Sequence, residues 1–186
     1  MKFYSFSFFL LLMFWISACN SKNASTLAQI DTSSEIVSTG GDTLPYFVNK
    51  RGDKIPKISK TETEWETELT PQEFYVLRKK GTERAGTGDL LNNKVEGLYV
   101  CRGCGMPLFS SKTKFESGTG WPSFYDVLDP AVLHIDTDYD LGYGRSELTC
   151  AKCGGHQGHV FNDGPEPTGL RYCINAVSLD FVKAEN

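Results

Sequence analysis

The sequence lacks an excess of basic residues. It has 19 lysines and arginines against 23 aspartates and glutamates, which gives a formal net charge of −4 at pH 7. Because nucleic-acid phosphates are bound by clustered lysines and arginines, this composition argues against DNA or RNA as a partner. The chain also contains no internal repeat apart from two C-x-x-C motifs. Its 186 residues predict one domain of ordinary size.

A long apolar run is missing as well. The N-terminal stretch from Phe3 to Ile16 is interrupted by serines, and it is shorter than the roughly 20 residues that a spanning helix needs. It follows the positive charge of Lys2 and precedes small residues. This pattern indicates an export signal over residues 1–18 rather than a transmembrane helix.

The end of this signal carries a further motif. The letters ISAC, which end at Cys19, resemble the lipobox of bacterial lipoproteins, which is cleaved before a cysteine that then carries lipid. We therefore expect lipidation of Cys19 and an exported lipoprotein, anchored to a membrane and facing the periplasm or the cell exterior. Ordinary cleavage and an uncleaved apolar anchor are the alternatives.

Residues 19–60 are rich in Ser, Thr, Asn and Gly and have no sustained hydrophobic period, which predicts a flexible tether. The folded domain is expected over residues 61–186, and its first element should be a short helix. Thr70 is placed as N-cap, with Pro71 in the first turn and a glutamate three residues after the cap, and Gly81 would end the helix.

The rest of the domain reads as short strands between Gly, Pro, Asn and Asp. Seven such runs are found, at residues 97–101, 107–111, 113–117, 132–139, 146–150, 159–162 and 171–182. Strands of this length and spacing favour antiparallel sheets. The predicted fold is therefore mainly β, with two small antiparallel sheets forming a sandwich or open barrel, a short N-terminal helix and a structural zinc site.

The zinc prediction comes from the cysteines. Six are present, and lipid on Cys19 would leave five, which cannot all pair as disulfides. Four thiolates in two C-x-x-C turns are what tetrahedral zinc requires. We predict one structural zinc ion per chain, and a pair of C-x-x-C disulfides is the alternative. The four predicted ligands, in CRGCG and CAKCG, are Cys101, Cys104, Cys150 and Cys153.

Cys173 has no place in this scheme. It lies in GLRYCIN, residues 169–175, and two further stretches stand out: SGTGWPSF, residues 117–124, and GGHQGHVFNDGP, residues 154–165. Together with the C-x-x-C motifs, these stretches resemble the methionine-R-sulfoxide reductase (MsrB) family over most of the domain. The resemblance implies a peptide-methionine (R)-S-oxide reductase that returns oxidised methionine in peptides and proteins to methionine.

Sulfoxide reduction needs a nucleophile that attacks sulfur and an acid that protonates the departing oxygen. Cys173 can supply the first, and His156 or His159 the second. Burial in an apolar strand would raise the pKa of a cysteine unless cations or donors oppose it. The two-residue period of a strand would put Arg171, Cys173 and Asn175 on one face, so we expect them to favour the thiolate.

The resemblance also implies a role for each residue. Cys173 would attack the sulfoxide and become a sulfenic acid, His159 would serve protonation of the oxygen, and His156 would belong to the same network. Asn175 would hold a pocket water or a histidine, while Asp163 and Arg171 would orient the histidines and favour the thiolate. Trp121 and Phe161 would contact the substrate.

The sequence departs from a common family pattern at Thr119, where many members carry a second, resolving cysteine. We therefore expect reduction of the oxidised enzyme by an outside thioredoxin-like protein or small thiol. A monomer is expected. A zinc-ribbon interaction module would explain the C-x-x-C motifs alone, and a cysteine hydrolase would explain the Cys and His pair but would also need an oxyanion hole.

Overall fold

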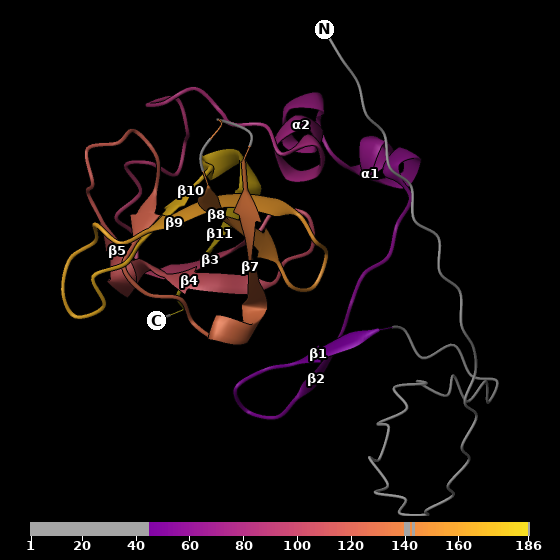
Figure 1. The fold of residues 1–186 in the computed structure, drawn as a ribbon, viewed down its shortest axis with the longest axis horizontal. Coiled ribbons are helices and arrows are strands. Elements are labelled where there is room, and N and C mark those ends of the chain that lie inside the picture. Colours follow the sequence, from indigo (N-terminus) through magenta and orange to yellow (C-terminus); the bar gives the residue numbers. More distant parts are fainter. Residues whose placement is uncertain (1–44, 140–141, 143, 186) are drawn as a thin grey trace, which may run out of the picture. The chain divides into compact units, whose positions relative to one another are not determined.

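The computed structural model describes residues 45–139, 142 and 144–185. The predicted signal peptide, Cys19 and the first part of the predicted tether lie outside this part of the chain. Among the described residues no helix combines the length and the apolar character needed to cross a membrane. The elements are shown in Figure 1.

The first described element is a β-hairpin, in the segment that the sequence analysis assigned to the end of the tether. Strand β1 (Tyr46–Val48) pairs with β2 (Lys54–Pro56). The Asn49 side chain closes the turn, because its Oδ1 accepts hydrogen bonds from the N–H groups of Arg51 and Asp53. The tether prediction missed this local side-chain turn, which can order a polar stretch.

Two short helices follow. Helix α1 (Glu62–Glu68) was not predicted, although Thr61 and Glu64 form a capping box at its start and Trp65 on it is buried. Helix α2 (Pro71–Lys79) matches the prediction, including the capping box between Thr70 and Glu73. Both helices lie at the same side of the sheets in Figure 1.

The predicted end of α2 was wrong in one detail. Lys80, not Gly81, takes the left-handed conformation at the C-cap, with φ 57°. At Gly81 the ring of the exposed Tyr75 lies against the position that a Cβ atom would take. The glycine therefore allows close packing rather than a left-handed turn.

The strands after α2 form two antiparallel sheets. The six-stranded sheet has the order β5-β6-β10-β9-β8-β7, and the three-stranded sheet has the order β11-β3-β4. Their bounds are β3 Gly97–Cys101, β4 Pro107–Ser110, β5 Lys114–Phe115, β6 Ser123–Phe124, β7 Leu133–Asp138, β8 Arg145–Cys150, β9 His156–Phe161, β10 Arg171–Ile174 and β11 Leu179–Lys183.

The mainly β, antiparallel prediction is confirmed, but the finer description of the sheets is not. Within the described residues the hairpin is a third sheet, one sheet has six strands, and there is no closed barrel. The predicted strand over residues 171–182 is in fact two strands in different sheets. The short 3-10 helix η3 (Ala176–Ser178) separates them and redirects the chain.

The core lies where side chains of the two larger sheets meet. Phe109 on β4 stacks on Phe124 on β6, with ring centroids 4.3 Å apart, and Tyr99 on β3 meets Phe124 edge-on at 4.9 Å. All three rings are fully buried, and Leu77 on α2 is almost fully buried. This aromatic cluster fixes β6 next to β10, and so fixes the strand that carries Cys173.

We expect Phe124→Ala to lower the free energy of unfolding by about 3–5 kcal/mol, because it removes a buried ring from a packed cluster. Urea denaturation followed by fluorescence would measure the change. The matched control is Ile135→Thr on the exposed side of β7, where Ile135 is 58% exposed. The control should stay within about 0.5 kcal/mol of the wild type. Equal losses in the two variants would contradict the assignment of the core.

Candidate active site

Cys173 lies in the middle of the six-stranded sheet. Its Cα pairs with Ser123 on β6 and with His159 on β9. It opens into a cavity of about 120 Å³. The lining residues are Thr82, Trp121, Arg145, Gly158, His159, Phe161, Cys173 and Asn175. Five of the predicted site residues therefore meet at one cavity, although they come from separate stretches of the chain.

Gly158 makes this meeting possible. A Cβ atom at this position would overlap the carbonyl oxygen of Cys173, and the φ of Gly158 is +150°. The glycine lets β9 and β10 approach closely at the point where both histidines and the cysteine stand. His156 and His159, the two histidines expected in the site, both lie on β9, and their ring centroids are 5.5 Å apart.

The environment of Cys173 acts on its ionisation in two opposing ways. Burial raises the pKa of the Cys173 thiol, against the lowering effects of the Thr119 hydroxyl and the Arg171 guanidinium. Arg171 thus acts on the sulfur in the expected direction, but burial has the larger effect. Desolvation of the charged form outweighs one hydroxyl and one cation, which disfavours the thiolate.

Arg171 and Asp163 contact each other rather than the histidines. The guanidinium donates from Nε to Asp163 Oδ1 at 2.8 Å and from Nη2 to Oδ2 at 2.9 Å, and it lies 4.3 Å from the centroid of the Phe161 ring. Its hydrogen bonds lower the pKa of Asp163. This bidentate pair fixes the positive charge beside Cys173.

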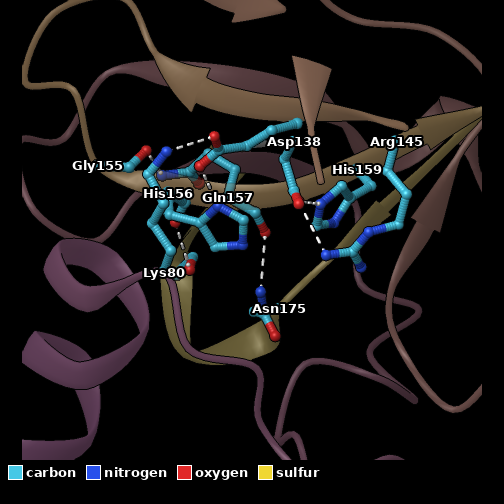
Figure 2. Close-up of polar contacts among 10 residues, drawn as sticks. Lys80, Asp138, Arg145, Gly155, His156, Gln157, His159 and Asn175 are labelled. Atoms are coloured by element: carbon cyan, nitrogen blue, oxygen red, sulfur yellow. Dashed lines mark hydrogen bonds and ion pairs between the residues drawn. The ribbon is translucent and has the colours of Figure 1, made fainter. Parts of the chain in front are cut away.

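The carboxylate that contacts His159 is Asp138, at the end of β7. Its Oδ2 lies 2.5 Å from His159 Nε2 and accepts from Arg145 Nη2 at 2.8 Å. Figure 2 shows the Asp138 carboxylate in contact with both His159 and Arg145. Asp138 and Arg145 were missed at the sequence level, because only the register of β7, β8 and β9 brings them to His159.

His156 is held by a different carboxylate. Its Nδ1 lies 2.8 Å from Glu147 Oε1, and Glu147 Oε2 accepts from Lys80 Nζ at 2.7 Å (Figure 2). Burial lowers the pKa of His156 despite the opposing effect of Glu147. The imidazole is therefore neutral at pH 7. Its Nε2 is buried and has no hydrogen-bond partner within the part of the chain that the structure describes.

Asn175 directly follows the end of β10 in an extended conformation and lines the same cavity as Cys173. Its Nδ2 donates to the Gln157 carbonyl at 3.3 Å, and its Oδ1 accepts from the Glu83 N–H at 3.1 Å. The Glu83 carbonyl also accepts from Trp121 Nε1 at 3.3 Å. Glu83, another residue missed at the sequence level, thereby links the two sides of the cavity.

Glu83 is itself buried. Burial raises the pKa of its carboxyl, against hydrogen bonds from the backbone N–H groups of Ala176 and Val177. Those donors lie 2.6 Å and 3.0 Å from its two oxygens. The carboxyl group therefore holds the start of η3, directly after Asn175, in a fixed place.

The four C-x-x-C cysteines form a second cluster. Their sulfur atoms all lie within 4.8 Å of one another. The Cys101–Cys153 and Cys104–Cys150 sulfur distances are 3.6 Å. Tetrahedral zinc with thiolate bonds of about 2.3 Å separates its ligands by about 3.8 Å, so the arrangement fits such an ion. No disulfide joins the five described cysteines. The predicted ligand set can hold a metal.

The turns of this cluster explain how it forms. In each motif the N–H of the glycine after the second cysteine bonds back to the first cysteine's carbonyl, from Gly105 to Cys101 at 2.8 Å and from Gly154 to Cys150 at 2.7 Å. Both glycines have positive φ, 68° and 70°. The motifs join β3 to β4 and β8 to β9, so a metal here would connect the two larger sheets.

Comparison with known proteins agrees with this geometry. Residues 69–183 match the family model described as the SelR domain. The chain is 58% identical over 132 residues to the "Peptide methionine sulfoxide reductase MsrB" of Methanosarcina mazei, covering 70% of this chain and 93% of that protein. It is 55% identical over 127 residues to the protein of the same name from Leptospira interrogans, covering 68% and 97%.

The protein of the same name from Thiobacillus denitrificans is 52% identical over 122 residues, covering 66% of this chain and 92% of that protein. The matched segments contain the cavity with Cys173, His159 and Trp121 and the four-cysteine cluster. The chain belongs to the SelR-domain family, that of the MsrB methionine sulfoxide reductases.

Proposed function

We propose that this chain reduces methionine-R-sulfoxide in peptides and proteins to methionine, as a peptide-methionine (R)-S-oxide reductase. The observation that carries the proposal is the meeting of Cys173, His159 and Trp121 at one cavity. The printed names of relatives that match most of the chain support it. A zinc-ribbon module would not need this cavity.

The reaction begins with attack of the Cys173 sulfur on the sulfoxide sulfur. The new S–S bond forms as the S–O bond weakens, and the oxygen takes up a proton. The oxygen then bonds to the Cys173 sulfur as its bond to the methionine sulfur and the new S–S bond both break, so methionine leaves as the thioether and Cys173 becomes a sulfenic acid. The thiol brings one proton and the sulfenic acid holds one, so the conversion needs no net proton from solvent.

Proton movement within this step is the task of the histidines. His159 lines the cavity with Cys173, and its Nε2 contact with Asp138 fixes the orientation of the ring. We assign to His159 the transfer of the proton from the thiol to the sulfoxide oxygen. His156 remains neutral and supports this network, and Asn175 keeps its amide at the edge of the cavity.

Substrate binding falls to the aromatic walls. Trp121 and Phe161 line the cavity together with Cys173. A methyl sulfoxide presents a small apolar group and a polar oxygen, and soft sulfur groups contact aromatic rings favourably. The Arg171 guanidinium against the Phe161 ring keeps that ring in place. Asp163 acts on the site only through Arg171.

The second part of the cycle needs a reductant from outside. Four of the described cysteines belong to the metal cluster, and Thr119 Oγ1 stands 3.8 Å from Cys173 Sγ, where many family members carry a resolving cysteine. We infer that a thioredoxin-like protein or a small thiol attacks the sulfenic acid, releases water and forms a mixed disulfide. A second thiol then frees Cys173.

The metal is proposed to be zinc, one per chain. Four thiolates suit zinc and leave no coordination position for water or substrate, so the ion would supply structural stability and no chemistry. The chain is further proposed to be a monomer that is exported and attached to a membrane through lipid on Cys19. The lipobox resemblance of the N-terminal sequence supports this part.

We expect Cys173→Ser to abolish turnover and His159→Asn to lower kcat/KM by about 10² to 10⁴, because the first removes the nucleophile and the second the proton-transfer group. The assay separates the two sulfoxide epimers of a methionine peptide by chiral chromatography. Wild-type protein should consume only the R epimer. Lys112→Ala, on the exposed turn before β5, is the control and should retain full activity. Turnover by Cys173→Ser would refute the proposal.

Oxidation with substrate alone should leave Cys173 as a sulfenic acid. Mass spectrometry after dimedone treatment should find the adduct on the peptide that contains Cys173, together with intact metal ligands. The Thr119→Cys variant should instead form a disulfide between residues 119 and 173 and give no adduct. An intramolecular disulfide to Cys173 in the wild type would contradict recycling by an outside thiol.

Removal of the metal should destabilise the fold without acting on the site directly. We expect one zinc per chain by elemental analysis, and a fall in Tm of about 10 °C or more when a chelator extracts it. Cys104→Ser should lose the metal, while Cys173→Ser should keep both metal and Tm. A metal-free wild type with unchanged Tm would overturn the structural role.

A further inference from the structure

Three hydroxyl side chains form a row that ends at Cys173. Ser117 and Thr119 lie in the loop between β5 and β6. Ser123 is the first residue of β6 and pairs with Cys173 on the neighbouring strand β10. Ser117 Oγ lies 2.8 Å from Thr119 Oγ1 and 2.7 Å from Ser123 Oγ. Thr119 Oγ1 lies 3.8 Å from Cys173 Sγ. The conversion of sulfoxide to methionine as proposed above makes no use of this row.

The loop that carries the row is held firmly. Gly120 has a φ of +92°, and a Cβ atom there would lie 2.9 Å from the Ala85 Cβ. The Gly120 carbonyl accepts from the Gly86 N–H at 2.8 Å. Ser117 also accepts from the Thr119 N–H at 3.4 Å. The position of Thr119 beside the sulfur is therefore built into the backbone.

The direction of the row follows from the single hydrogen on each hydroxyl. Ser123 Oγ donates to the carbonyl oxygen of Trp121 at 3.2 Å, and a carbonyl can only accept. Ser123 therefore accepts from Ser117, and Ser117 in turn accepts from Thr119. Thr119 has used its hydrogen, so its lone pairs face Cys173 and suit the S–H of a thiol.

Ionisation of Cys173 demands the opposite order. A thiolate has no hydrogen to give and accepts hydrogen bonds instead, so Thr119 must turn its hydrogen toward the sulfur. Ser117 must then donate to Thr119, and Ser123 must donate to Ser117. The Trp121 carbonyl loses its donor as a result, which carries a cost for a group in a tightly packed turn.

We propose that this row is a reversible hydroxyl relay, in which Thr119 contacts the reacting sulfur and Ser117 sets the direction in which Thr119 points. The inference rests on the proposed function of Cys173 as nucleophile and deepens it. With the row in its resting order Cys173 stays a thiol, and with the row reversed Thr119 stabilises the thiolate or the oxygen of the sulfenic acid. The thiol proton leaves through His159, because the row ends at a carbonyl that cannot take it.

Other groups also act on the sulfur and must be held constant. Arg171 on the same strand favours the thiolate, and Asp163 opposes it. His159 on β9 and Arg145 on β8 line the same cavity. From the loop and β6, the groups near the sulfur are the three hydroxyls and the Trp121 ring. Variants in the row leave all four charged or titratable groups in place.

The test measures the ionisation of Cys173 directly. The full chain is alkylated with iodoacetamide over a range of pH, and the labelled Cys173 peptide is quantified by mass spectrometry. We expect Thr119→Val to react about tenfold more slowly below the pKa, since one hydrogen bond to an ionised group is worth about that factor. The rate profile should move to higher pH. Thr119→Ser keeps the hydroxyl and should match the wild type.

Ser117→Ala should have the opposite effect. The variant removes the acceptor of the Thr119 hydrogen, so this hydrogen can point to the sulfur and the other hydroxyls need not reorient. Alkylation of Cys173 should therefore be faster, and its pH profile should move to lower pH. The double variant should behave as Thr119→Val, because Ser117 acts through Thr119. Equal slowing by Ser117→Ala and Thr119→Val, or no change in either, would overturn the relay.

The readout separates this inference from the proposed function. Alkylation needs no sulfoxide, so the opposite shifts would support the relay even if the wild type did not reduce the R epimer. If the wild type reduces the R epimer but the alkylation profiles of Ser117→Ala and Thr119→Val do not move in opposite directions, the reductase proposal is supported and the relay is contradicted. Circular dichroism of each variant checks that the comparison is made between folded proteins.

Discussion

The close approach of β9 and β10 at Gly158 is the constraint on which the site depends. A side chain at that position would overlap the Cys173 carbonyl, and the pairing of His159 with Cys173 would be lost. With the glycine in place, one strand supplies the Cys173 sulfur, which we propose as the nucleophile, and its neighbour supplies both imidazoles. Two short stretches that are separate in the sequence thus form one reaction centre.

The polar groups around this centre are arranged so that each histidine has its own carboxylate. Asp138 holds His159 at the cavity, and Glu147 holds His156 in the interior. Both carboxylates are also bound by a cation, Arg145 in one case and Lys80 in the other. Such pairs can remain ionised inside a fold because their charges are compensated and hydrogen-bonded. They fix the positions of both rings.

The state of the sulfur has a consequence for the cycle. Burial raises the pKa of the Cys173 thiol and so disfavours the thiolate, which is the form that reacts with electrophiles. The same thiol proton balances the oxygen that departs from the substrate. The four-cysteine cluster joins turns of the two larger sheets, so under the proposed function one chain would use sulfur both as scaffold and as reagent.

The sequence by itself determined the local features: the capping box of α2, the antiparallel strands, the paired C-x-x-C turns and the family motifs around Cys173. These depend on residues close together in the chain, whose spacing carries the information. Only the tertiary structure decided that Asp138 and Glu147 serve the histidines, that Asp163 binds Arg171, and that Asn175 leaves the strand. Those contacts depend on strand register and on η3, which join residues far apart in sequence, and no local pattern encodes them.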